Sequence, residues 1–75
     1  MPCIDGSGKL SESGRRILAA LARPITLEEA ARQSGLPLYR IRSGAREMVR
    51  AGLVEEKAGA YMATPAGQAL LRAES

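Results

Sequence analysis

Arginine residues gather in one short segment of this 75-residue chain. Residues 37–52 contain four arginines and one glutamate, a net charge of +3, and the whole chain has the same net charge of +3. The rest of the chain therefore balances to zero. A guanidinium group donates paired hydrogen bonds to a phosphate or to the major-groove edge of guanine. The charge pattern thus favours an anionic partner for this segment.

The same segment has the spacing of an amphipathic helix, which we predict over residues 37–51. At about 3.6 residues per turn, five apolar positions fall on one side and are predicted to face the core: Leu38, Ile41, Ala45, Met48 and Val49. Polar side chains cover the remaining surface. We predict that six of these polar residues, together with Lys57 further along the chain, contact the anionic partner. The predicted contact residues are Tyr39, Arg40, Arg42, Ser43, Arg46, Arg50 and Lys57.

These polar residues also have a plain structural interpretation, a solvated helix surface. Arg46 and Arg50 are four residues apart and repel each other on a helix, which favours contact with a partner. Glu47 can neutralise part of this charge, which favours the solvated surface. Tyr39 can pack beside the preceding turn, and Lys57 can be an ordinary turn charge. The sequence leaves these alternatives open.

Residues for catalysis or metal binding are scarce. The chain has no histidine and a single cysteine, Cys3, and its only neighbouring carboxylates are the pairs Glu28-Glu29 and Glu55-Glu56. Acid–base and nucleophilic catalysis need such groups close together, and so do zinc and calcium sites. We therefore expect a protein that is not an enzyme and has no cofactor, metal or small-molecule ligand.

Two helices are predicted ahead of the arginine-rich segment. The first spans residues 11–23, with Ser11 or Ser13 as its cap, and ends at Pro24. Residues 24–25 form a short extended piece. Residues 26–29 are a capping box, in which the side chains at both ends bond each other's amides, so a second helix begins at residue 27. Gly35 ends that helix, and its predicted inward residues are Leu27, Ala30 and Ala31.

A hairpin and a last helix follow the arginine-rich segment. Residues 53–57 and 60–63 are predicted strands around a turn at Ala58-Gly59. Thr64 and Pro65 then start a helix over residues 66–73, with Ala66, Ala69 and Leu70 facing inward. We predict a flexible N-terminal tail over residues 1–10 and one mainly α domain with a small β-hairpin (α+β) over residues 11–75. The predicted order is helix, short strand, helix, helix, strand, strand, helix.

Three stretches of sequence resemble a known group of proteins. They are TLEEAARQSGLP (26–37), REMVRAGLVEE (46–56) and YMATPAGQALL (61–71). In this order they are similar to winged helix-turn-helix regulators such as the multiple-antibiotic-resistance repressor (MarR) and arsenical-resistance repressor (ArsR) superfamilies. The resemblance implies a small transcriptional regulator that binds double-stranded DNA. Residues 37–51 would enter the major groove, and residues 53–64 would form a short wing.

The resemblance leaves the partners open in two respects. Such regulators usually have longer flanking helices that build a dimer, so we expect here a weak homodimer or a larger protein partner. Lys57 is the only base in the wing, and Glu55 and Glu56 precede it. A winged-helix module that binds another protein is therefore an alternative, and RNA binding is a further one.

Composition places the chain among soluble intracellular proteins. Hydrophobic residues make up 45% of it, and the longest apolar run, residues 17–22, is far shorter than the roughly 20 residues of a membrane span. Asp5, Gly6 and Gly8 interrupt the region where a signal peptide would be apolar. The single cysteine cannot form an internal disulfide, which is typical of a reducing compartment. We expect a cytoplasmic location and no membrane partner.

Overall fold

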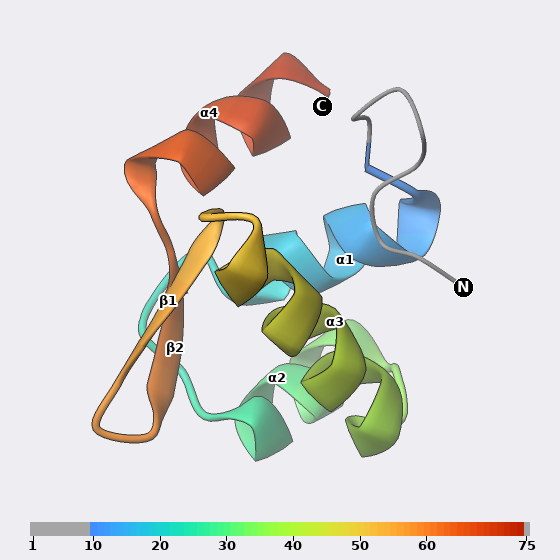
Figure 1. The fold of residues 1–75 in the computed structure, drawn as a ribbon. Coiled ribbons are helices and arrows are strands. Elements are labelled where there is room, and N and C mark those ends of the chain that lie inside the picture. Colours follow the sequence, from blue (N-terminus) through green and yellow to red (C-terminus); the bar gives the residue numbers. More distant parts are fainter. Residues whose placement is uncertain (1–9, 75) are drawn as a thin grey trace.

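The computed structural model describes residues 10–74. It is mainly helical, with a two-stranded antiparallel hairpin between the third and fourth helices, and so belongs to the α+β class (Figure 1). The elements are α1 (Glu12–Ala20), α2 (Leu27–Ser34), α3 (Leu38–Arg50), β1 (Val54–Lys57), β2 (Ala60–Ala63) and α4 (Pro65–Ala73). The predicted order of elements is confirmed, and the short strand between α1 and α2 is a single bridge.

The N-terminal tail that we predicted lies outside the described residues, except for Leu10. Leu10 packs against the core. Its amide donates to both carboxylate oxygens of Glu74, at 3.1 and 3.3 Å. Leu10, which we assigned to the tail, therefore packs against the domain.

Side-chain caps begin three of the helices. The hydroxyls of Ser11, Thr26 and Thr64 each accept a hydrogen bond from the amide three residues further on, at 3.0, 3.2 and 3.2 Å. The expected capping box at α2 is only half formed, because the Glu29 carboxylate accepts a hydrogen bond from Arg32 within the helix. Local sequence thus determines where these helices begin.

The end of α1 differs from our prediction. The helix ends at Ala20 rather than at residue 23, and Leu21 follows it as a buried cap residue. Beyond it the backbone of Ile25 pairs with Tyr61 in both directions, at 3.1 and 2.8 Å. The Leu21 carbonyl also accepts from the amide of Ala63 at 2.7 Å. Pairing with β2 therefore draws the chain out of the helix before Pro24 would have ended it.

A tight turn joins α2 to α3. Gly35 has a left-handed backbone, with φ of +74°, and its amide donates to the carbonyl of Ala31 at 3.0 Å. L-residues with a side chain rarely adopt that conformation, so glycine suits the position. Pro37 then precedes the first residue of α3. This confirms the predicted sequence of helix, short glycine turn and helix.

The register of the hairpin determines which of its side chains face α3. Val54 lies opposite Ala63, and both are buried in the core. Side chains alternate along a strand, so the next pair toward the turn on this same face is Glu56 and Tyr61. Lys57 projects from the other face of the hairpin. Ala58 and Gly59 form the two-residue turn, with φ of +54° and +84°.

The core lies where α1, α2, α3 and the hairpin meet. Its buried residues are Ile17, Leu18, Leu21, Ala30, Ile41, Ala45, Met48, Val54 and Ala63. For α3 this confirms three of the five predicted core residues, while Leu38 is only half-buried. Val49 was predicted wrongly, because 39% of its surface is exposed. It lies at the edge of the apolar stripe, on the side facing the hairpin.

The inward side of α4 also differs from our prediction. Of the three residues predicted to face inward, Ala66 and Ala69 are exposed, and only Leu70 is half-buried. Gly67 is buried and lies so close to Leu53 that a Cβ atom on it would be 2.1 Å from the Leu53 carbonyl oxygen. This backbone contact sets the rotation of α4 and turns Leu71 toward the core.

Candidate functional site

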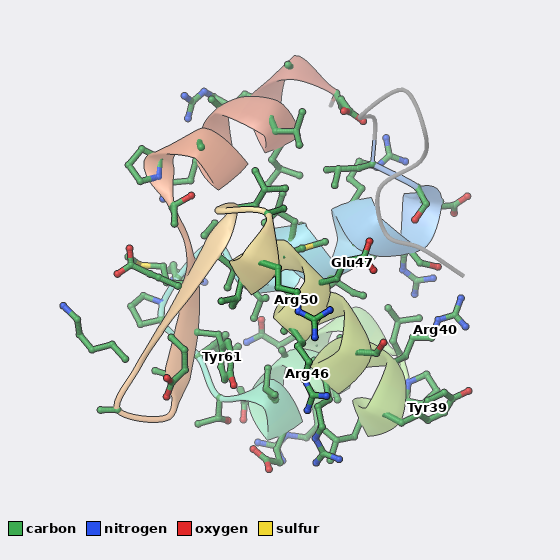
Figure 2. The ribbon with its side chains drawn as sticks, viewed as in Figure 1. Tyr39, Arg40, Arg46, Glu47, Arg50 and Tyr61 are labelled. Atoms are coloured by element: carbon green, nitrogen blue, oxygen red, sulfur yellow. The ribbon has the colours of Figure 1, made fainter. Side chains whose placement is uncertain are left out.

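The outer side of α3 carries most of the predicted contact residues. Tyr39 is 69% exposed, and the other exposed members are Arg42, Ser43, Arg46 and Arg50. Figure 2 shows Tyr39, Arg46 and Arg50 spread along this side of the helix. Five of the seven predicted residues are therefore brought together on one accessible surface.

Arg40 is separated from this surface. It is half-buried, and its Nη2 atom donates to the hydroxyl of Ser13 in α1 at 3.2 Å. Glu47, also half-buried, lies on the same flank of α3 (Figure 2). Arg40 therefore joins α3 to α1, and its guanidinium group is already partly engaged within the protein.

Lys57 lies apart from the arginines of α3. It is exposed at the end of β1, directly before the turn. Because its neighbour Glu56 is on the face toward α3, Lys57 is on the opposite face of the hairpin. Only a partner large enough to extend past the hairpin tip can contact Lys57 and the arginines together.

A hollow of about 250 Å³ lies between α3 and the hairpin, and we call it the α3–hairpin hollow. Its lining residues are Arg42, Arg46, Val49, Arg50, Glu56 and Tyr61. Figure 2 shows Tyr61 on the side of the hairpin that faces α3. Three of these residues, Val49, Glu56 and Tyr61, were absent from the predicted site. Alternation along the strand from Val54 was the sequence signal that points to Glu56.

The three arginines of the α3–hairpin hollow keep their hydrogen-bond donors available. Within residues 10–74, Arg42, Arg46 and Arg50 have neither an ion pair nor a hydrogen bond to another side chain. They follow each other at four-residue steps, or about 6 Å of helix rise per step. Like charges at that spacing cost about 0.2–0.5 kcal/mol per pair. An anion bound here would remove that cost.

Glu56 is the one acidic residue in the hollow. Its Oε2 atom accepts a hydrogen bond from the amide of Gly59 at 2.9 Å, which fixes the carboxylate against the turn. The hollow therefore combines three cations and one anion with an apolar wall made by Val49 and the ring of Tyr61. Such a surface suits an anionic group that also has bulk to pack.

Two further hollows lie between α1 and α2 and have less positive charge. One, of about 410 Å³, has Arg23 and Glu29 as its charged residues, and the other, of about 340 Å³, has Arg16. In the described part of the chain, no three His, Cys, Asp or Glu side chains gather as a metal site would require. No helix among the same residues is long and apolar enough to cross a membrane.

The sequence matches no protein-family model and no curated protein.

Proposed function

We propose that the protein binds double-stranded DNA as a small winged helix-turn-helix regulator. In this proposal α3 enters the major groove and the β1–β2 hairpin acts as a short wing. The observation that carries the proposal is the row of exposed arginines, Arg42, Arg46 and Arg50, without ion-pair partners in the described residues. It lies on the second helix of a helix-turn-helix, which is the helix that this motif offers to DNA.

The chemistry of the row suits a duplex backbone. Its three guanidinium groups span about 12 Å along the helix axis, so more than one phosphate is within their reach. Phosphate contacts fix the position of a protein on DNA, while base edges supply sequence information. Tyr39 and Ser43, at the start of the same surface, have hydroxyls that can donate to either. Arg40 would act indirectly, by holding α3 against α1.

The arginine surface of α3 is small, and its size affects which protein partners the chain needs to bind DNA. A single helix with three free arginines and one lysine at the wing gives few phosphate contacts, and affinity at physiological salt follows the number of such contacts. We therefore propose a weak homodimer, or a larger protein partner, that doubles the contacts on paired half-sites. We also propose a cytoplasmic location and no enzymatic activity.

Glu56 supports a second candidate, a module that binds an acidic protein. A carboxylate in the α3–hairpin hollow opposes a uniformly anionic partner, whereas a protein partner can offer cations as well. RNA binding is the third candidate, since guanidinium groups bind the phosphates of either nucleic acid. These alternatives require different probes.

The test uses fluorescence anisotropy with three labelled probes at about 50 mM salt. They are a random DNA duplex, an RNA duplex of the same sequence and a peptide of net negative charge that contains both glutamate and lysine. We expect the DNA duplex to bind most tightly, and its affinity to fall with salt by a log–log slope of about −0.9 per phosphate contact. A double charge reversal, R46E/R50E, should abolish binding, while R23E should not. Tighter binding of the acidic peptide or of RNA than of DNA would refute the proposal.

A further inference from the structure

The α3–hairpin hollow has a feature that DNA binding alone does not explain, an acidic residue facing the arginines. Its charged lining is Arg42, Arg46, Arg50 and Glu56, a net charge of +2. Of the three hollows described above, it is the most positive. The expected ligand is thus a single phosphate rather than a small neutral molecule.

Glu56 is held in place by the fold. It lies opposite Tyr61 in the hairpin, and its carboxylate accepts the Gly59 amide at 2.9 Å. Gly59 can offer that amide because the two-residue turn is left-handed at both positions. The carboxylate therefore stays at the rim of the hollow and does not swing freely into solvent.

The fixed carboxylate weakens the binding of any phosphate that enters the hollow. Its negative charge repels the phosphate and also offsets part of the positive charge of the arginines. Both effects act on the backbone contact, which is the same for every DNA sequence. Because the loss is the same for every sequence, it lowers the affinity for all duplexes and leaves the ratio of affinities between sequences unchanged.

We propose that the α3–hairpin hollow binds one phosphate of the duplex backbone, and that Glu56 limits the affinity of this contact. The inference rests on the proposed DNA binding. It adds that the hollow contacts the DNA backbone and that the first turns of α3 make the base contacts. It also adds that Glu56, in the wing, limits the affinity of the backbone contact.

The chain offers a matched control for the test. Glu55 and Glu56 are neighbours in β1, and Glu55 lies on the face turned away from α3. E56Q and E55Q change the net charge equally, so long-range electrostatics affects both variants alike. Glutamine keeps an oxygen that can accept the Gly59 amide, so the hairpin should stay folded in E56Q. Circular dichroism melts check this for both variants.

Anisotropy titrations of a panel of DNA duplexes at about 50 mM salt measure the effect of Glu56 on DNA affinity. We expect E56Q to bind every duplex about two- to fivefold more tightly than wild type, the effect of one exposed charge. The difference should shrink as salt rises, because exposed charges are screened. E55Q should change the affinity less than twofold.

The outcomes separate the two proposals. If wild type binds DNA but E56Q and E55Q have equal effects, or E56Q binds less tightly, the role of the hollow and of Glu56 is refuted while DNA binding stands. If neither wild type nor E56Q binds any duplex, both proposals fail.

Discussion

Replacing Gly67 with alanine should destabilise the domain, although alanine is the better helix former. A Cβ atom at this position would lie 2.1 Å from the Leu53 carbonyl oxygen and 3.0 Å from its carbonyl carbon. Both are backbone atoms, so the clash cannot be relieved by rotating a side chain. The first turn of α4 would have to move away from the start of the hairpin.

The size of the effect follows from what that movement breaks. Thr64 donates to the Leu53 carbonyl through its amide at 2.9 Å and to the Gly52 carbonyl through its hydroxyl at 2.7 Å. Each such hydrogen bond contributes about 1 kcal/mol, and overpacking adds about 1–3 kcal/mol. The gain in helix propensity from glycine to alanine is about 1 kcal/mol. We expect a net loss of at least about 2 kcal/mol.

Thermal unfolding followed by circular dichroism measures this loss. For a domain of this size, about 2 kcal/mol lowers Tm by about 8–16 °C. The control is A69G in the same helix, at an exposed position, which should cost about 1 kcal/mol through propensity alone. If propensity governed both positions, G67A would raise Tm while A69G lowered it. A Tm for G67A at or above that of wild type would refute the close contact.

Three further substitutions test separate parts of the structure. A58G should stabilise the domain by about 1 kcal/mol, because Ala58 has a φ of +54° and a left-handed backbone costs a residue with a side chain about that much; an unchanged urea midpoint would argue against this turn. S13A should lower stability by about 1 kcal/mol or less, since it removes the acceptor for Arg40, and an unchanged urea midpoint would argue against this contact between α3 and α1. K57A should weaken binding to all duplexes alike and reduce the salt slope by about 0.9, whereas sequence-dependent losses in anisotropy titrations would contradict a phosphate contact.

Local features of the fold were predictable from sequence. Ser11, Thr26 and Thr64 cap helices through amides only three residues away, and Gly35 ends α2 through its own backbone conformation. Such signals need no knowledge of the rest of the chain. The spacing of apolar residues likewise identified most of the buried side of α3, because its period reflects a single helix.

Features that depend on distant partners were missed. The early end of α1 follows from the pairing of Ile25 with Tyr61, across the chain. The rotation of α4 follows from the contact of Gly67 with Leu53. In each case two segments must first meet before the local outcome is determined, so local spacing contains no signal for it.

In the candidate site, too, features within one helix were predictable and features that join two elements were not. Its arginines were found because they share one helix and one period. Arg40 was misplaced because its partner, Ser13, belongs to α1. The α3–hairpin hollow was missed because Tyr61 reaches it from β2. The sequence thus indicated the charge of the surface but not its shape.

The salt dependence of duplex binding tests the central proposal most directly. Wild type, R46Q and R23Q have to be compared by anisotropy over about 50–200 mM salt, where log K should fall linearly with log salt concentration. We predict that R46Q reduces the slope by about 0.9, the loss of one phosphate contact, and that R23Q leaves it unchanged. Equal slopes for wild type and R46Q, or an affinity that does not respond to salt, would contradict DNA binding through α3.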